Sequence, residues 1–329
     1  MNRLLKYFLI LAIVPTLVMT SCKKDEEPTT MGDYTTVKDY MVANSMDLPA
    51  ILSGWVLDAK LIADGGIVDP ADYSIPGYHV LDIRAAADFA TGHIKGAVNT
   101  TLANILVTAA DKKDKPILVV CYTGQTAGHA VMALRLMGYQ GAAVLKWGMA
   151  AWSADFSGPW TGAIGSPAVG NANWVTTAAP TTGVFGYPTW TSTTTDGAAL
   201  LSERVNAMLT AGFKGVASAD VLAAPANYNI INYWPAADYT TFGHFAGAYD
   251  VPVISLAGDL IKGIDPSKET LIYCYTGQTS SMAVAWLNTL GYNAKSIKFG
   301  ANSLVYDDLK AAAKPVYKQA YGYTYVTGK

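Results

Sequence analysis

One six-residue motif occurs twice in the chain, and this repeat constrains the fold more than any other feature of the sequence. The motif Cys-Tyr-Thr-Gly-Gln-Thr fills residues 121–126 and again residues 274–279. Three further segments also occur twice, in the same order in both copies, and each second copy lies about 150 residues after the first. They pair residues 92–97 with 243–248, 134–139 with 287–292, and 146–148 with 298–300. The chain is therefore a duplication, and each copy is long enough to form a domain.

The composition is that of a globular protein. Of the 329 residues, 51% are apolar and 15% are charged, which excludes an intrinsically disordered chain. This length suits two domains of ~130 to 150 residues each. The formal net charge is −2 and the body of the chain carries no cluster of lysine or arginine. We therefore expect no nucleic-acid partner.

Each copy alternates apolar runs that are typical of buried strands with a segment of helical periodicity. In the first copy we expect strands at 78–82, 116–121 and 143–145 and a helix at 126–137. In the second copy we expect strands at 228–231, 270–274 and 296–299 and a helix at 279–290. Gly138 and Gly291 follow the two helical segments, where a helix is expected to stop. The pattern predicts an α/β fold of two tandem domains, each a parallel sheet flanked by helices.

The expected organisation has five parts. They are a signal peptide at 1–22, a tether at 23–33, a first domain at 34–156, a linker at 157–196 and a second domain at 197–320. The linker is rich in glycine, proline and threonine, so we expect an extended segment over the surface. Trp160, Trp174 and Trp190 indicate that this linker packs against the domains.

The N-terminal segment has the pattern of an export signal. Arg3 and Lys6 precede an apolar run over residues 7–19, which is too short to span a membrane comfortably. Small residues then precede Cys22, which resembles the lipobox of bacterial lipoproteins, where cleavage leaves a lipid-bearing cysteine at the N-terminus. An uncleaved anchor and a plain secretory signal are the alternatives. The resemblance implies lipidation of Cys22 and a place in the cell envelope, on the periplasmic or outer-surface side of a bacterial membrane.

In each copy a cysteine ends a buried strand, and a helix begins a few residues later. Ligands bind at the carboxyl ends of strands in open α/β sheets. The glycine in the loop lets backbone N–H groups turn inward, and the helix adds the positive end of its dipole. Such surroundings stabilise a thiolate, so we expect Cys121 and Cys274 to be partly ionised near neutral pH. The alternative is an inert cysteine at the end of a core strand, which the repetition of the whole loop argues against.

The sequence around the first loop resembles the rhodanese (sulfurtransferase) family. The resemblance rests on residues 81–84, on Asp88 and Phe89, on residues 92–99, on the cysteine loop and on residues 147–148. It covers residues 72–156 well and residues 222–309 less well. Tandem copies in one chain are a known arrangement of this family.

The resemblance implies a mechanism through a cysteine persulfide. The thiolate of Cys121, and of Cys274 in the second copy, takes a sulfane sulfur from a donor and passes it to a thiophilic acceptor such as a thiol or cyanide. No metal and no organic cofactor are needed. The loop residues would hold the negative charge of the persulfide; they are Tyr122, Thr123, Gly124, Gln125, Thr126, Tyr275, Thr276, Gly277, Gln278 and Thr279.

The chain departs from the family pattern in two places. Thr126 and Thr279 close loops in which many relatives carry a basic residue, so thiosulfate, a persulfide and a polysulfide all remain open as donors. Phosphate-ester chemistry is disfavoured, because the related phosphatase loop is longer and ends in arginine. In the second copy Asn-Tyr-Trp at 232–234 replaces the segment that holds Asp82 and Arg84. We interpret that ion pair as structural, and we expect both copies to be active.

The remaining titratable residues are predicted to be structural. His93 and His244 lie in the repeated Gly-His pair and are expected to shape a turn. His129 has methionine as its counterpart in the second copy, so a shared acid–base role is not expected. Asp88 and Asp238 are expected to cap or pair at the surface.

Two other functions remain open at this point. A non-enzymatic persulfide carrier or a sulfide-sensing module of the envelope would use the same loop. A redox protein would join Cys121 to Cys274, which requires Cα atoms within about 7 Å. The three cysteines and four scattered histidines do not predict a metal site. The expected partners are a sulfur donor, a thiol acceptor and, through the lipid, a membrane; the oligomeric state is left open.

Overall fold

The computed structural model describes residues 31–328, and the chain from Met31 onward forms one compact unit. The predicted signal peptide, its lipidation at Cys22 and most of the tether lie outside the described residues. None of the helices in residues 31–328 is both long enough and apolar enough to cross a bilayer.

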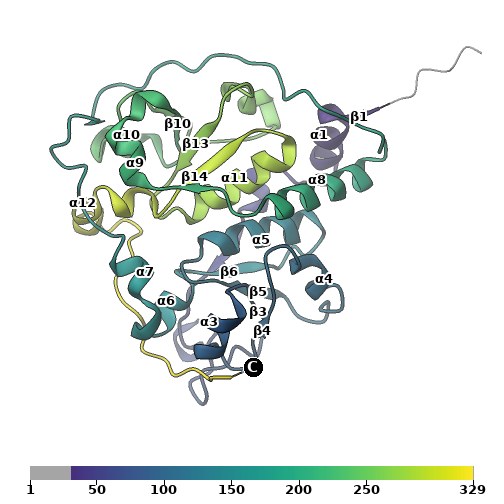
Figure 1. Ribbon diagram of the computed structural model, residues 1–329, viewed down its shortest axis with the longest axis vertical. Helices are drawn as coiled ribbons and strands as arrows, with labels where there is room; N and C mark the ends of the chain where they lie inside the picture. The colour runs from purple at the N-terminus through teal and green to yellow at the C-terminus, as the bar shows by residue number, and fades with distance from the viewer. Residues whose placement is uncertain (1–30, 329) are drawn as a thin grey trace, which may run out of the picture. The chain divides into compact units, whose positions relative to one another are not determined.

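Two five-stranded sheets form the framework within the described residues, and every neighbouring pair of strands in them is parallel (Figure 1). The first has the order β2 (Val56–Leu57), β6 (Ala143–Leu145), β5 (Ile117–Val120), β3 (His79–Asp82) and β4 (Val98–Asn99). The second has β9 (Gly215–Val216), β14 (Ala294–Ile297), β13 (Thr270–Tyr273), β10 (Asn229–Asn232) and β12 (Tyr249–Asp250) in the corresponding places. The predicted α/β fold, with a parallel sheet flanked by helices in each half, is confirmed.

The central strand of each sheet is buried on both faces, as its apolar sequence predicts. In β5 all four side chains are buried. Ile117 and Val119 face one hydrophobic cluster, whereas Leu118 and Val120 face another. Because β5 is paired with a strand on each side, its backbone N–H and C=O groups are not exposed to water. Its carboxyl end is therefore a rigid support for the loop that follows.

The helices cover the faces and edges of the sheets. They are α1 (Tyr34–Ala43), α2 (Leu48–Ile51), α3 (Ala86–Thr91), α4 (Ile105–Ala109), α5 (Gln125–Leu136), α6 (Met149–Trp152), α7 (Gly158–Thr161), α8 (Gly197–Ala211), α9 (Ser218–Ala223), α10 (Ala236–Thr241), α11 (Gln278–Leu290) and α12 (Tyr306–Ala311). Four short strands form two further antiparallel pairs. Strand β1 (Gly32–Asp33) pairs with β8 (Thr191–Ser192), and β7 (Trp174–Val175) pairs with β11 (His244–Phe245).

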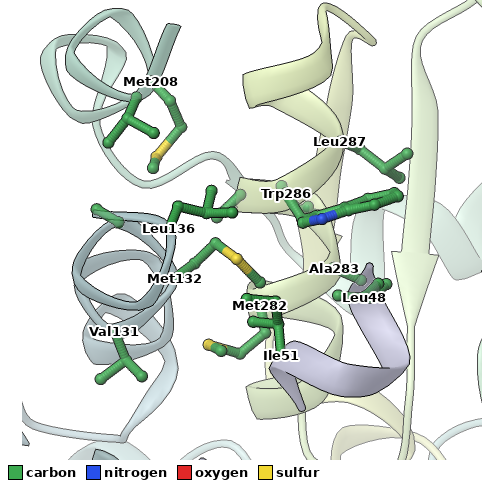
Figure 2. Close-up of a cluster of buried hydrophobic side chains, with 14 of the residues drawn as sticks. Leu48, Ile51, Val131, Met132, Leu136, Met208, Met282, Ala283, Trp286 and Leu287 are labelled. Carbon is green, nitrogen blue, oxygen red and sulfur yellow. The ribbon is translucent and has the colours of Figure 1, made fainter. Parts of the chain in front are cut away.

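The two halves share one hydrophobic core. Helices α5 and α11 run side by side between the sheets, and Met132 and Met282 meet between them (Figures 1 and 2). Trp286 of α11 and Ile51 of α2 lie in the same cluster, and both are buried. Burying one large apolar side chain stabilises a fold by about 1.5–3 kcal/mol. Separating the halves would expose this whole cluster, so the two halves stabilise each other.

The segments that leave each half cross to the other half. After the first half, Gly165 N–H donates to Asn302 O at 3.0 Å. After the second half, the C-terminal segment returns along the first, where Tyr321 N–H donates to Ala151 O at 2.7 Å (Figure 1). Within the predicted linker, Trp160 is completely buried. The exchange of these segments fixes the position of one half on the other.

Candidate functional site

Cys121 is the first residue after β5, at the carboxyl end of the first sheet. Its side chain is 5% exposed. The Gly124 N–H donates to Cys121 Sγ at 3.1 Å, and α5 begins at the next residue. Gly124 has a φ of 79°, in the left-handed region that favours glycine. The strand, the glycine turn and the helix start therefore bring a backbone donor onto the sulfur.

The turn that contains Gly148 packs against the first cysteine loop, and this close contact explains why the glycine is repeated in the second copy. Met149 N–H donates to Cys121 O at 2.9 Å, and Ala150 N–H donates to Tyr122 O at 3.1 Å. A Cβ on Gly148 would lie 2.2 Å from Cys121 O, so the two backbones approach closely only because residue 148 has no side chain. The second copy repeats this arrangement, because a Cβ on Gly300 would lie 2.2 Å from Cys274 O.

Cys274 has the same place after β13 but a different donor. It is 2% exposed. The Ser280 N–H, in the first turn of α11, donates to Cys274 Sγ at 3.4 Å. The thiol in turn approaches Ser280 Oγ at 3.7 Å. The longer contacts indicate a weaker hold on this sulfur than the Gly124 donor provides in the first copy.

The structure corrects the expectation that the Cys121 thiol is partly ionised near neutral pH. Burial raises the pKa of the Cys121 thiol above its ordinary value. The backbone N–H groups of Ala127, Thr123 and Gly124 lower this pKa, but the burial outweighs them, and the negative charge of Asp82 raises it further. The thiol is therefore protonated at rest, and the backbone donors reduce the cost of ionising it.

This direction predicts how the reactivity of Cys121 depends on pH. Because the raised pKa keeps the thiol protonated at neutral pH, the rate of alkylation should still be rising above pH ~8.5, the ordinary value for cysteine. The measurement uses the full chain with a small alkylating reagent, and mass spectrometry follows the Cys121 peptide. A rate that is already constant between neutral pH and the alkaline range would be inconsistent with a raised pKa.

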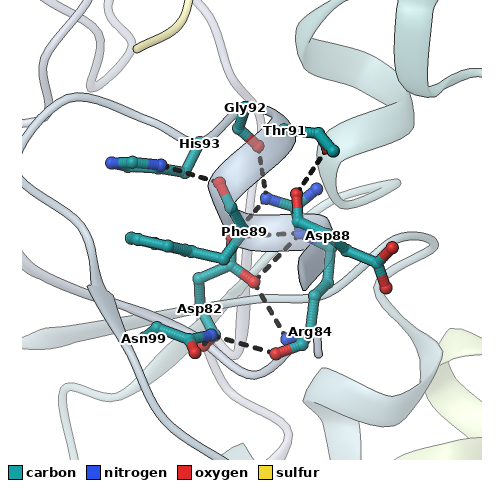
Figure 3. Close-up of polar contacts among 8 residues, drawn as sticks. All are labelled: Asp82, Arg84, Asp88, Phe89, Thr91, Gly92, His93 and Asn99. Atoms are coloured by element: carbon teal, nitrogen blue, oxygen red, sulfur yellow. Dashed lines mark hydrogen bonds and ion pairs between the residues drawn. The ribbon is translucent and has the colours of Figure 1, made fainter. Parts of the chain in front are cut away.

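Asp82 and Arg84 form a buried ion pair behind the loop (Figure 3). Arg84 Nη2 lies 2.6 Å from Asp82 Oδ2 and donates to Gly92 O at 2.7 Å. Asn99 Nδ2 donates to the backbone oxygens of Asp82 at 3.0 Å and Arg84 at 2.9 Å. The guanidinium also lies 5.1 Å from the centre of the Tyr122 ring. The pair thus ties the end of β3 to the turn after α3, to β4 and to the cysteine loop.

The two histidines of the Gly-His pairs have similar surroundings. His93 Nδ1 contacts Phe89 O at 2.9 Å, and its ring stacks on the Phe89 ring at 3.6 Å between centres. His244 Nδ1 contacts Tyr239 O at 3.1 Å, and it stacks on the Tyr239 ring in the same way. Both rings are buried against the helix that precedes them.

The second copy replaces the ion pair with other contacts. Asn232 Nδ2 donates to Tyr273 Oη at 2.7 Å. Asp238, which was expected at the surface, is buried instead. It accepts from Lys314 Nζ at 2.7 Å and from the Tyr275 hydroxyl, because the C-terminal segment brings Lys314 over this side of the loop. The expectation of an exposed pair is wrong for this residue.

The ten predicted loop residues differ in exposure. Those buried are Gly124, Gln125, Thr276, Gly277 and Gln278, and those half-buried are Tyr122, Thr123, Thr126, Tyr275 and Thr279. Cys121 and Cys274 are free thiols. His129 is completely buried, and burial lowers its pKa to about 3, so it is neutral. Its Nδ1 contacts Ser281 Oγ at 3.0 Å, which makes it part of the contact between α5 and α11.

Two residues that the sequence did not place at the first loop contact it in the structure. Trp160 Nε1 donates to Thr123 O at 3.3 Å, and Gln278 Nε2 donates to the same oxygen at 2.8 Å. The counterpart of Gln278 is Gln125, whose Oε1 accepts from Phe299 N–H at 2.8 Å. The duplication is the one signal that could have found this arrangement, because repeated glutamines on paired helices can reach across to the opposite loop.

Comparison with known proteins places the first half in a family. The sequence model of one protein family, the rhodanese-like domain, matches residues 71–155 of this chain. The thiosulfate sulfurtransferase GlpE of Pseudoalteromonas translucida is 33% identical over 79 residues, which are 24% of this chain and 75% of that protein. The GlpE of Shewanella oneidensis is 36% identical over 75 residues, which are 22% of this chain and 73% of that protein.

Among solved structures, a thiosulfate sulfurtransferase from Pseudomonas aeruginosa is 15% identical, with a TM-score of 0.27. That match covers 80% of this chain but 45% of the length of the other protein. The residues matched by the family model, 71–155, include the Asp82–Arg84 pair and Cys121. On the sequence matches to the family model and to the two GlpE proteins, the chain belongs to the rhodanese-like family.

Proposed function

We propose that the protein is a sulfurtransferase that moves a sulfane sulfur from a donor to a thiophilic acceptor through a persulfide on Cys121. Membership of the rhodanese-like family supports this proposal. The observation that carries it is the Gly124 N–H, which donates to Cys121 Sγ at 3.1 Å immediately before α5 begins. Hydrogen bonds from N–H groups are strongest when the acceptor is charged, so this donor favours an anionic sulfur over a neutral one.

The proposed transfer has two displacement steps. The Cys121 thiolate attacks the outer sulfur of the donor, a new S–S bond forms, and the donor leaves with the electron pair of its broken bond. The thiolate of the acceptor then attacks the outer sulfur of the persulfide, and Cys121 leaves as a thiolate. The sulfur atom is transferred from the donor to the acceptor without net oxidation, so the two steps need no redox cofactor.

Thiosulfate, a persulfide and a polysulfide are the candidate donors. The loops contain no basic residue, and Arg84 is already paired with Asp82. This favours a donor whose recognition does not depend on a dianion, such as a polysulfide or a protein-borne persulfide. The test is a multiple-turnover assay in which each donor is supplied in excess with a thiol acceptor. Turnover with one of the three identifies the donor, and transfer with none of them would rule out the proposal.

A non-enzymatic persulfide carrier, or a sulfide-sensing module, is the second candidate. The observation that favours it is burial, because Cys121 is 5% and Cys274 is 2% exposed. A donor can reach either sulfur only after the loop opens, which suits slow loading by a docked partner. A carrier would pass on one sulfur per cysteine and then stop, whereas an enzyme would continue for many cycles.

We further propose that the two halves are tandem rhodanese-like domains, with boundaries near 34–156 and 197–320, and that Cys274 is a second sulfur carrier. The equal strand order of the two sheets and the repeated loop support this.

We also propose that Cys22 carries lipid and holds the protein on a bacterial membrane in the cell envelope. The signal pattern of the sequence supports this proposal. The Cys22→Ala variant should move from the membrane fraction to the soluble fraction, because it lacks the acylated residue. Detection of both forms by immunoblot after fractionation is the measurement. Equal membrane recovery of the variant and the native chain would exclude lipid at Cys22 as the anchor.

A further inference from the structure

One peptide group in the first cysteine loop is held from both ends. This group joins Thr123 to Gly124. Its N–H, on Gly124, donates to Cys121 Sγ at 3.1 Å. Its carbonyl, on Thr123, accepts from Gln278 Nε2 at 2.8 Å and from Trp160 Nε1 at 3.3 Å. In a trans peptide the C=O and the N–H point in opposite directions within one plane, so fixing the oxygen also fixes the direction of the hydrogen.

Both donors to this carbonyl come from outside the first sheet and its cysteine loop. Gln278 belongs to the second cysteine loop and is the first residue of α11, and it is 2% exposed. Trp160 belongs to α7, in the segment that leads to the second half, and it is completely buried. Its ring stacks on Tyr317 at 5.5 Å and meets Phe299 edge-on at 5.0 Å. Close packing on several sides leaves the indole N–H little freedom to turn away.

The fit between the halves is tight at this peptide. A Cβ on Gly124 would lie 2.2 Å from Gln278 Nε2, so the glutamine reaches the carbonyl only because residue 124 is glycine. If the peptide rotated, its carbonyl would face the sulfur and its N–H would face two other donors. Gln278 and Trp160 would then lose their acceptor in a buried site, which is unfavourable. The geometry therefore favours one orientation of this peptide, with its N–H on the sulfur.

We propose that Gln278 and Trp160 are positioning residues, which hold the Thr123–Gly124 peptide so that its N–H stabilises the anionic sulfur of Cys121. The second half thereby activates the cysteine of the first half. The role of these two residues in sulfur transfer rests on the proposed function, whereas their effect on the Cys121 thiol does not. Hydrogen bonds accepted by the carbonyl also polarise the peptide and strengthen the bond that its N–H donates.

The arrangement is not reciprocal, which makes the proposal specific to Cys121. Gln125 is the counterpart of Gln278, but its Oε1 accepts from Phe299 N–H at 2.8 Å and its Nε2 donates to Thr123 Oγ1 at 3.2 Å. The sulfur of Cys274 receives its hydrogen bond from Ser280 N–H at 3.4 Å. Loss of the Trp160 indole N–H should therefore change Cys121 and leave Cys274 as it was.

The test measures how the alkylation rates of the two cysteines in the full chain depend on pH. Mass spectrometry follows the Cys121 and Cys274 peptides separately. Gln278→Met keeps the length of the side chain and removes its N–H, and we expect the Cys121 midpoint to move upward by about one pH unit. Trp160→Phe removes the indole N–H and keeps an aromatic ring. It should move the midpoint in the same direction by less, because its bond is the longer one.

The control variant is Gln319→Met, which makes the same change at an exposed glutamine of the C-terminal segment. It should leave both midpoints unchanged. Asp82 and Arg84, the charged pair behind the loop, are kept in every variant, so their effect on Cys121 cancels in the comparison. Near-ultraviolet circular dichroism establishes that each variant is folded. Should Gln278→Met not fold, Trp160→Phe with Cys274 as its internal reference decides the question.

Sulfur transfer is the second readout. A midpoint one unit higher leaves about ten-fold less thiolate at neutral pH, so transfer from polysulfide should fall about ten-fold there and recover as the pH rises. An unchanged Cys121 midpoint in a folded Gln278→Met or Trp160→Phe variant would overturn the positioning role. If the native chain transfers no sulfur from any donor but the midpoints move as expected, the proposed function fails and the positioning of the peptide stands.

Discussion

The Cys121→Ser variant is expected to lose most of its multiple-turnover sulfur transfer, and the double variant Cys121→Ser with Cys274→Ser at least about a thousand-fold, as removal of the nucleophile does in other covalent enzymes. A serine hydroxyl does not ionise in this pH range and does not accept sulfane sulfur. Its oxygen can still accept the Gly124 N–H that now donates to Cys121 Sγ at 3.1 Å, so the loop should keep its shape. The initial rate with excess donor and a thiol acceptor is the measurement.

Cys274→Ser is the matched control for this prediction. It makes the same atomic change at the equivalent position of the second loop, where the donor to the sulfur is Ser280 N–H at 3.4 Å. We expect a smaller loss, because the Cys121 site keeps its shorter donor. If Cys274→Ser abolishes transfer and Cys121→Ser keeps the native rate, the reaction belongs to the second copy. If neither variant loses activity, neither cysteine is the nucleophile.

The Arg84→Met variant should have the largest effect on stability, a loss of about 3–5 kcal/mol in the free energy of unfolding. Asp82 and Arg84 are 1% and 4% exposed, so the variant leaves a carboxylate in the interior without its cation. Gly92 O also loses the donor that now lies 2.7 Å away. Urea denaturation followed by circular dichroism measures the change.

A double variant separates the ion pair from simple packing. Asp82→Asn together with Arg84→Met removes both charges, and the second copy already carries Asn232 and Trp234 in these places, with Asn232 at the end of the formed strand β10. We expect the double variant to be more stable than Arg84→Met alone, since no unpaired charge stays buried. A single variant within about 1 kcal/mol of the native chain, or a double variant less stable than the single one, would show that the pair does not hold this end of the sheet.

The central strands and the long helices could be predicted from the sequence because burial on both faces determines local composition. The run that predicted a strand at 116–121 forms β5 at Ile117–Val120, and the predicted helix at 279–290 is α11 at Gln278–Leu290. Gly291 has a φ of 100° at the end of that helix, as a glycine stop implies.

The edges of the sheets and the exchanged segments could not be predicted in the same way. Strand β9 has two residues, Gly215–Val216, and its place beside β14 depends on tertiary contacts rather than on any local pattern. The C-terminal segment returns to the first half, where Val326 bridges to His93. Pairing between residues so far apart in the sequence leaves no periodic pattern of apolar residues from which it could be predicted, because it depends on how the two halves pack together.

At the site, the loop could be predicted and its electrostatics could not. The repeated motif located Cys121, and the strand–turn–helix context predicted a backbone donor, which Gly124 provides. The expected direction of the thiol pKa was wrong because the shared core buries Cys121 among the residues of α5, and burial outweighs the donors. The contact of Gln278 with Thr123 O depends on how the halves meet, which the loop sequence does not state.

The most direct measurement is the mass of the Cys121 peptide after the full chain has been incubated with polysulfide. We predict a gain of one sulfur atom on this peptide, which a thiol acceptor then removes while turnover proceeds. An unmodified Cys121 peptide at every time point, in a protein that is transferring sulfur, would contradict the assignment of Cys121 as the sulfur carrier.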